Sequence, residues 1–408
     1  MTMPASASLS RRALLVRALL AAGVLALLLG AIWGGLLRLG WALPTPRSDL
    51  AALHGPLFVC GMLGTVIGLE RAVALGRPWA FSGPLLAMAG GLGLLAGLPA
   101  SLGALLITAG SLGLLLVFAV LVRRQPARFV VTMALGAAAW LVGNLLWLVG
   151  RPLAVASFWW AGFLVLTILG ERLELGRLRQ LPARALRIFV LGVATLLLGL
   201  GATPIAYGAG ARLSGAGFVI LGLWLLAFDI ARRTVRRAGL PRFTAVCILS
   251  GSVWLAVAGG IALSAGAVYA GPVYDALLHA VFVGFVFAMI FGHAPIIIPA
   301  LLQIPLAFNR WSYLPLVALH LSLLLRVAGD LTLRLDLRRW GGMLNALAIA
   351  LFLLLTLASA LRARRQPKHS ASPSETPVFP PSTAGIDPAT ARNPDDGRII
   401  KEVQDGRT

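Results

Sequence analysis

Twelve long apolar runs constrain this chain more than any other feature, because each is long enough to cross a lipid bilayer. They cover approximately residues 14–37, 50–69, 79–98, 102–122, 129–149, 153–170, 186–204, 211–231, 243–267, 275–299, 312–328 and 341–361. A spanning helix needs about 20 predominantly apolar residues, and it satisfies its backbone hydrogen bonds within one segment. The sequence therefore predicts an all-α polytopic membrane protein with about twelve transmembrane helices.

The composition agrees with a membrane protein and excludes an ordinary soluble domain. Hydrophobic residues make up 59% of the chain, and its mean hydropathy is +0.90. The 35 Lys and Arg residues against 14 Asp and Glu give a formal net charge of +21. Because the arginines gather in short connections between apolar runs, the predicted partner of this charge is the anionic surface of a lipid bilayer and not a nucleic acid.

The distribution of arginine also predicts the orientation of the chain. Arginine-rich connections alternate with poorer ones, which predicts that both termini face the cytoplasm. One cluster, Arg334, Arg338 and Arg339, falls in a connection of the opposite set and argues against this orientation. Residues 1–365 are predicted to form the membrane domain, and residues 366–408, rich in Pro, Ser, Thr and Asp, a disordered cytoplasmic tail.

A weak internal repeat indicates how the helices are organised. Residues 61–71 (GMLGTVIGLER) in the second run are echoed by residues 162–172 (GFLVLTILGER) in the sixth, and more loosely by residues 284–292 (GFVFAMIFG) in the tenth. Three repeats of a four-helix unit, as in subunit I of the haem-copper oxidases, would explain this spacing. The alternative is that glycine-rich helices with basic inner ends simply look alike.

Four of the five histidines lie inside apolar runs and are candidate functional residues, because an ionisable side chain in a membrane helix is costly. They are His54, His279, His293 and His320, whereas His369 lies in the polar tail. The second and tenth runs both descend from the outer face, so His54 and His279 are expected at a similar depth. Two imidazoles on opposing helices at one depth can bind a single haem iron axially.

The other two histidines are expected at comparable depth in the inner half of the membrane, with His293 about 21 Å below the outer pair by helical rise. His293 and His320 could then ligate a second haem, or a copper ion with Met289 as a further ligand. The alternative is that one of them hydrogen-bonds a backbone carbonyl freed by Pro295 or Pro299, which interrupt the tenth run beside His293.

Two further features bear on a bound haem. Arg326, near the outer end of the eleventh run, can pair with a propionate, although Asp330 competes for it at helical salt-bridge spacing. Cys60 and Cys247 lie in apolar runs without any C-x-x-C pattern, which excludes c-type haem attachment and a thiolate zinc site. Any haem is therefore held without covalent attachment, as a b-type haem is.

These residues resemble two families of haem proteins. Residues 54–57 (HGPL) are similar to the His-Gly-x-Leu stretch whose histidine ligates the low-spin haem in subunit I of haem-copper oxidases, and His279 matches the opposite ligand on the tenth helix. Residues 278–284 (LHAVFVG), followed by Gly292 and His293, look like the His-Ala-Leu-x-x-Gly motif of the NnrS family. Members of that family are haem- and copper-containing bacterial membrane proteins linked to nitric-oxide stress.

The chain departs from the oxidases where they bind copper. Their sixth helix carries a histidine and their seventh a histidine pair, whereas here the sixth run offers Phe158, Trp159 and Trp160 and the seventh has no histidine. The resemblance therefore implies an NnrS-like haem protein, with copper as a candidate second metal, in nitric-oxide tolerance or respiratory electron transfer. Its implied partners are a quinol or cytochrome as electron donor and a diatomic gas. Because two histidines fill both axial positions, gas chemistry would need an open site elsewhere.

Two other classes of function are also consistent with the sequence. Twelve spans, traces of a repeat and a proline-interrupted tenth run are compatible with a transporter of a small solute, although no acidic residue occupies the middle of a span. A structural subunit without a cofactor is the third class, in which the histidines only satisfy internal polar contacts. Bound haem distinguishes the first class from the other two.

Overall fold

The structure is a computed structural model that describes residues 11–176, 181–302, 306 and 308–365. Every regular element in this part of the chain is helical, and twelve helical spans are long and apolar enough to cross a membrane. The predicted all-α polytopic fold is thereby confirmed, and each predicted apolar run corresponds to one span. The predicted tail, residues 366–408, lies outside the described residues.

Most spans are single α-helices, and two contain a π-helical segment. The single helices are α1 (Arg11–Arg38), α5 (Ala100–Arg124), α6 (Arg128–Leu148), α7 (Leu153–Leu175), α8 (Ala183–Ala202), α9 (Tyr207–Phe228), α11 (Leu240–Ala265) and α15 (Leu335–Arg365). Short 3₁₀ turns, η2 (Pro78–Phe81) and η4 (Arg310–Ser312), precede α4 (Ser82–Ala96) and α14 (Tyr313–Leu331), and α10 (Ala231–Thr234) lies in a connection. The second span consists of α2 (Leu50–Pro56), π-helical η1 (Leu57–Leu63) and α3 (Gly64–Leu75), and the tenth of α12 (Pro272–His279), π-helical η3 (Ala280–Phe287) and α13 (Ala288–Leu302).

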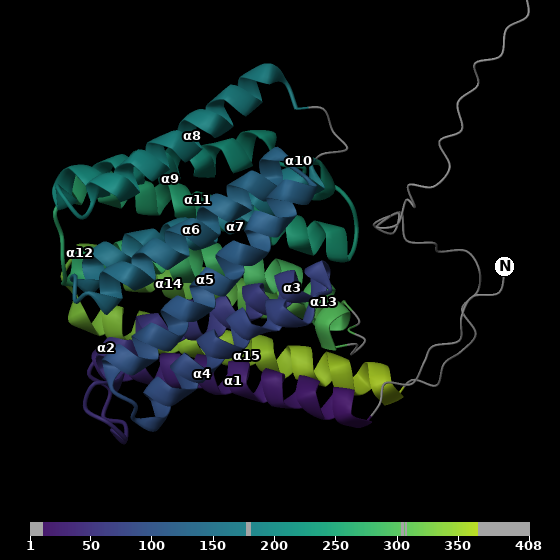
Figure 1. Cartoon of the computed structure of the whole chain (residues 1–408). Coiled ribbons are helices and arrows are strands. Elements are labelled where there is room, and N and C mark those ends of the chain that lie inside the picture. The colour runs from purple at the N-terminus through teal and green to yellow at the C-terminus, as the bar shows by residue number, and fades with distance from the viewer. Residues whose placement is uncertain (1–10, 177–180, 303–305, 307, 366–408) are drawn as a thin grey trace, which may run out of the picture. The chain divides into compact units, whose positions relative to one another are not determined.

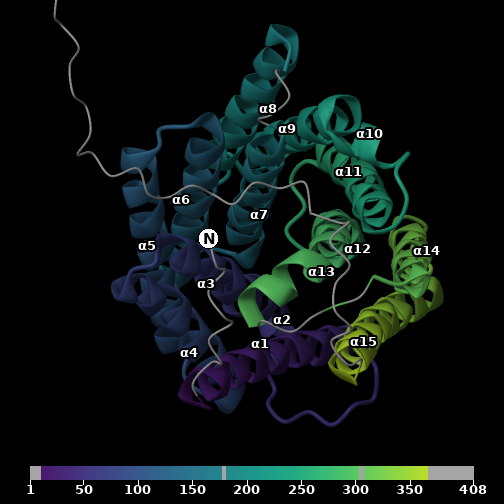
Figure 2. The same ribbon diagram turned by 90° about the vertical axis from the view of Figure 1, so that its right-hand side faces the viewer.

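The second, sixth and tenth spans lie toward the interior of the bundle. Viewed along the helices in Figure 2, α2 and α3, α7, and α12 and α13 are flanked by the remaining helices. These three spans are also the most buried of the twelve. Inner spans that recur every four helices match the unit that the sequence repeat predicts.

Charged residues at the ends of the inner spans hold them together. Arg71 Nη2 at the end of α3 lies 2.7 Å from Oε1 of Glu171 near the end of α7. The next residue, Arg172, makes a bidentate, almost fully buried pair with Asp229 at the end of α9. Both pairs lie at the end of the bundle where α1 begins and α15 ends (Figure 1). An even number of spans places these two helix termini on one face of the bundle.

Glycine allows α9 and α11 to approach closely. A Cβ atom at Gly259 of α11 would clash with the carbonyl oxygen of Gly215 and would come within 2.7 Å of the backbone nitrogen of Val219 on α9. A Cβ atom at the next residue, Gly260, would meet nothing within 4 Å. Small residues that bring two backbones together are a common basis of helix packing in membranes.

We expect Gly259→Ala to destabilise the protein by about 1–3 kcal/mol, because a closely packed interface resists an added methyl group. The measurement is the melting temperature of the purified protein in detergent. Gly260→Ala is the matched control on the same helix, and its melting temperature should be unchanged or slightly higher, since alanine favours helix over glycine. Equal melting temperatures for the two variants would contradict the close approach of α9 and α11.

Candidate functional site

A cavity of about 290 Å³ lies at the opposite end of the bundle, between the inner helices α2, α7 and α12 and the outer helices α1, α14 and α15. Its volume is at the lower end of the range of about 300–1,000 Å³ that ligand pockets occupy. Aromatic rings from the two π-helical segments form part of its wall, and Phe58 of η1 stacks on Phe287 of η3 with ring centroids 5.0 Å apart. Both charged and neutral polar side chains converge on this apolar wall.

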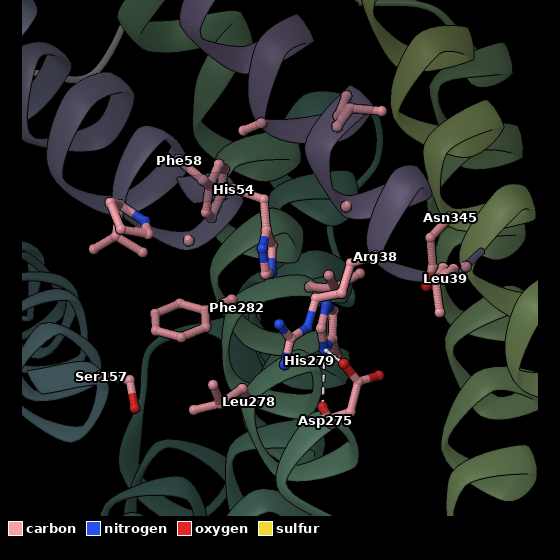
Figure 3. A pocket seen from close by; sticks show the side chains of 18 of the residues that line it. Arg38, Leu39, His54, Phe58, Ser157, Asp275, Leu278, His279, Phe282 and Asn345 are labelled. Carbon is pink, nitrogen blue, oxygen red and sulfur yellow. Dashed lines mark hydrogen bonds and ion pairs between the residues drawn. The ribbon is translucent and has the colours of Figure 1, made fainter. Parts of the chain in front are cut away.

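The structure brings together the outer pair of histidines that the sequence predicted. His54 comes from the second span and His279 from the tenth, and both line the cavity. Figure 3 shows the two imidazole rings pointing toward each other across it. A ligand that fills a cavity of this size therefore contacts both rings.

Both rings are oriented by a hydrogen bond to their own helix. Nδ1 of His54 donates to the carbonyl of Ala51 at 2.7 Å, and Nδ1 of His279 donates to the carbonyl of Asp275 at 2.8 Å. Because a carbonyl oxygen only accepts, Nδ1 carries the proton and Nε2 of the neutral ring keeps a free lone pair. Metal-binding histidines are typically oriented in this way by a carbonyl or carboxylate at the other nitrogen.

A π-helical segment begins directly after His279 and three residues after His54. The helix α2 ends at Pro56 and continues as η1, and α12 ends at His279 and continues as η3. Pro56 lacks the N–H that would continue the α-helical hydrogen bonds, which accounts for a disturbance in the second span. Such segments are rare and occur frequently at functional sites. Their position beside both histidines indicates that this end of the bundle is specialised.

Arg326 borders the cavity, but its ion-pair partner is not Asp330. Its Nε and Nη2 atoms donate to Oδ2 of Asp275 on α12 at 3.0 and 2.8 Å. The expected local pair with Asp330 is therefore wrong. Asp330 faces α15 instead, where Nε of Arg338 lies 2.9 Å from its Oδ1 atom. Helical spacing makes two residues neighbours, but in a buried environment the packing of α14 between α12 and α15 decides which charges meet.

Sequence reasoning missed Asp275 as a site residue. Its Oδ1 atom lies 3.5 Å from Nδ1 of His279 and 3.7 Å from Nη2 of Arg338. The carboxylate thus connects a cavity histidine to two arginines. Its spacing of four residues before His279 is a signal that could have identified it, because residues so spaced share a helix face.

Arg38, at the end of α1, was likewise missed and was assigned only to a connection. It lines the cavity, and Figure 3 shows its guanidinium extending toward His279. Within the part of the chain that the structure describes, Arg38 makes no hydrogen bond or ion pair. Its guanidinium is therefore available to an anionic group of a ligand.

The structure does not join the inner pair of histidines. Nδ1 of His320 accepts from the indole N–H of Trp254 at 3.0 Å, so Nε2 carries the proton and donates to Ser250 Oγ at 2.8 Å. No hydrogen bond links it to His293 among the described residues. In that same part of the chain, no group of three or more His, Cys, Asp or Glu side chains could hold a metal ion. A second metal at His293 and His320 stays a prediction.

His293 itself resembles the outer histidines in its hydrogen bonding. Its Nδ1 donates to the carbonyl of Met289 at 2.7 Å, and its Nε2 is buried without a partner among the described residues. The carbonyl that accepts is not one freed by proline, since Pro295 lacks the N–H that would bond the carbonyl of Phe291, four residues earlier. The predicted hydrogen bond from His293 to a backbone carbonyl is thus present, but the carbonyl is not one that a proline leaves without a partner.

Internal partners account for Arg338 and Arg339, two of the three arginines in the cluster that argued against the predicted orientation. Arg338 pairs with Asp330, while Arg339 donates to the carbonyl of Gly40 at 3.1 Å and lies 4.9 Å from the ring centroid of Trp41. These guanidiniums are bound to the protein itself.

Comparison with known proteins assigns the chain to a family. No protein with a curated description and no solved structure matches it. A family model described as "Domain of unknown function (DUF8744)" matches residues 15–361, which include all the cavity residues discussed above. Because this match extends over most of the sequence, the chain belongs to the family of that description.

Proposed function

We propose that the protein is a haem-binding integral membrane protein, NnrS-like, in which His54 and His279 hold a b-type haem from opposite sides. The observation that carries this proposal is the pair of free Nε2 lone pairs that two different spans present to one cavity. Axial ligation by two imidazoles requires this tautomer at both residues. The π-helical segments that follow both histidines also support a ligand site here.

The other side chains of the cavity suit an amphiphilic, planar, anionic ligand. Phe58, Phe282 and Phe287 offer apolar contacts to a macrocycle, and Arg38 offers a guanidinium to a propionate. Arg326, which the sequence suggested as the propionate partner, already donates two N–H groups to Asp275. Its role in this proposal is to hold Asp275 beside His279, and Arg38 takes the role of anion partner.

A haem held in this way supplies a one-electron redox couple when bound. The protein positions it, keeps its face apolar and neutralises its carboxylates. The proposed setting is nitric-oxide tolerance or respiratory electron transfer in a bacterial inner membrane, with both termini cytoplasmic and a quinol or cytochrome as donor. Copper is not part of this proposal, because both ring nitrogens of His320 are engaged in hydrogen bonds.

The visible absorption spectrum of the protein, purified in detergent after expression with ample haem, tests the proposal. We expect a Soret band and, after reduction with dithionite, the sharp α and β bands of low-spin haem. The variant with both His54→Ala and His279→Ala is the control, and it should be folded but lack these bands. A featureless spectrum of the wild-type protein would overturn the proposal and favour a transporter, which flux measurements in liposomes would then examine.

A further inference from the structure

The two cavity histidines differ in their polar contacts, and His279 has the larger number. Its Nδ1 donates to the carbonyl of Asp275 and also lies 3.5 Å from the Asp275 carboxylate. That carboxylate is fixed in turn by Arg326 of α14, through two hydrogen bonds, and by the nearby Arg338 of α15. Rotation of the His279 ring therefore breaks its contacts with Asp275, whose carboxylate is held in place by arginines of α14 and α15.

His54 has no comparable support. Its Nδ1 makes one hydrogen bond, to the carbonyl of Ala51 within the same turn. Across from His54, Gly34 of α1 packs closely on the backbone of α2 and on the Cβ atom of His54, whereas a Cβ atom at Gly35 would touch only the Cδ2 atom of His54, at 4.0 Å. The neighbouring helix thus contacts the base of the His54 side chain and leaves space only beside its ring.

We infer that the two axial ligands have different roles: His279 is the permanent ligand, and His54 is an exchangeable one whose place a neutral diatomic gas takes. This inference rests on the proposed haem function and goes beyond it, since two permanent ligands leave no open position. With haem bound, Nε2 of His54 would give up its coordination position to the gas, while Nε2 of His279 would keep its own. His54 leaves as a neutral imidazole with its lone pair, so no electron or proton is transferred.

Asp275 acts in this scheme as a positioning residue. A carboxylate near Nδ1 makes an imidazole a stronger donor and fixes its ring, as second-shell carboxylates do at metal sites. His54 has no carboxylate within hydrogen-bond or ion-pair distance among the described residues. His279, the stronger donor, would therefore stay bound to the iron, and the gas would displace His54, the weaker donor.

Single alanine variants of the two histidines test the inference, with carbon monoxide as the probe. His54→Ala should retain most of its haem, convert to a high-spin five-coordinate spectrum and bind carbon monoxide at a rate proportional to its concentration. His279→Ala should lose at least about tenfold in haem affinity, the lower end of what even a lost second-shell partner costs a metal site. In the wild-type protein the rate should level off at high carbon monoxide, because dissociation of His54 then limits it.

A second measurement addresses Asp275 directly. Asp275→Asn removes a negative charge beside His279, so the midpoint potential of the haem should rise, and Asp275→Glu should restore it in part. Loss of haem from the wild-type protein would refute the proposed function itself. Haem that is retained equally in the two histidine variants, retained better in His279→Ala, or unable to bind carbon monoxide in the wild type would overturn the inference and leave the haem proposal standing.

Discussion

Asp229→Leu is expected to lower the free energy of unfolding by about 3–5 kcal/mol, the usual cost of removing one partner of a buried ion pair. Oδ1 and Oδ2 of Asp229 accept from Nη2 and Nε of Arg172 at 2.8 and 2.9 Å, and both residues are less than 5% exposed, at 3% and 4%. The variant leaves the guanidinium of Arg172 buried without a counter-charge. Thermal unfolding in detergent should therefore begin at a markedly lower temperature.

The double variant Arg172→Met with Asp229→Leu should recover most of this loss, because it leaves no buried charge. A deficit of about 1 kcal/mol should remain, since Asp229 Oδ1 also accepts from the backbone nitrogen of Ala231 at 2.7 Å, as a helix cap does. Asp49→Asn is the control at a pair that is much less buried. There the hydrogen bond from Arg47 holds the pKa of Asp49 below its usual value, and its side chain is 45% exposed. Such pairs contribute at most about 1 kcal/mol.

A double variant as unstable as Asp229→Leu alone would contradict the buried-charge explanation. The loss would then come from packing at the end of α9. The pair matters to the fold because it ties α7, the most buried span, to the end of α9. We therefore expect the instability to be global and not confined to one helix.

The twelve spans could be predicted because the thickness of the hydrocarbon fixes their length and composition. The limits of each span were harder, and α7 shows why. It was predicted to end at residue 170 and extends to Leu175, past Glu171 and Arg172. Isolated in the sequence, two charged residues indicate the edge of the membrane. In the fold Glu171 pairs with Arg71 and Arg172 pairs with Asp229, so the helix continues past these charges inside the bundle.

Only those residues of the candidate site that are matched by their depth in the membrane could be predicted from the sequence. His54 and His279 are matched by their distance from the ends of their spans, and no further knowledge of packing was required. Arg38 lies at a helix end, where a charge ordinarily reaches water, so nothing in its local sequence indicates that it faces a cavity. For Asp275 the only signal is its spacing of four residues from His279, which places both on one helix face. The ion-pair partner of Arg326 depends on which helices flank α14, and the periodicity of the sequence does not reveal these neighbours.

Arg38→Gln is expected to weaken haem binding by about 10- to 100-fold. A hydrogen bond to a charged group is worth about 1.5–3 kcal/mol, and about 1.4 kcal/mol corresponds to tenfold in affinity. Arg38 is the anion partner in the proposed site because it lines the cavity and is bonded to no other described residue. The measurement is a haem titration of the haem-free protein, followed by the Soret absorbance, for the wild type, Arg38→Gln and Arg38→Lys. The lysine variant keeps the charge but not the bidentate geometry and should lie between them.

The melting temperature of the haem-free protein distinguishes a role of Arg38 in ligand binding from a structural role. Since Arg38 pairs with no described residue, its loss strands no buried charge, and the melting temperature of the haem-free protein should not change. Arg326→Gln should lower both haem affinity and melting temperature, because it leaves Asp275 with a weaker partner. Arg339→Gln, at the same end of the bundle but outside the cavity, should leave haem affinity unchanged. Unchanged haem affinity in Arg38→Gln would mean that the anionic groups of the ligand face another residue, with Arg326 then the nearest cation of the cavity wall.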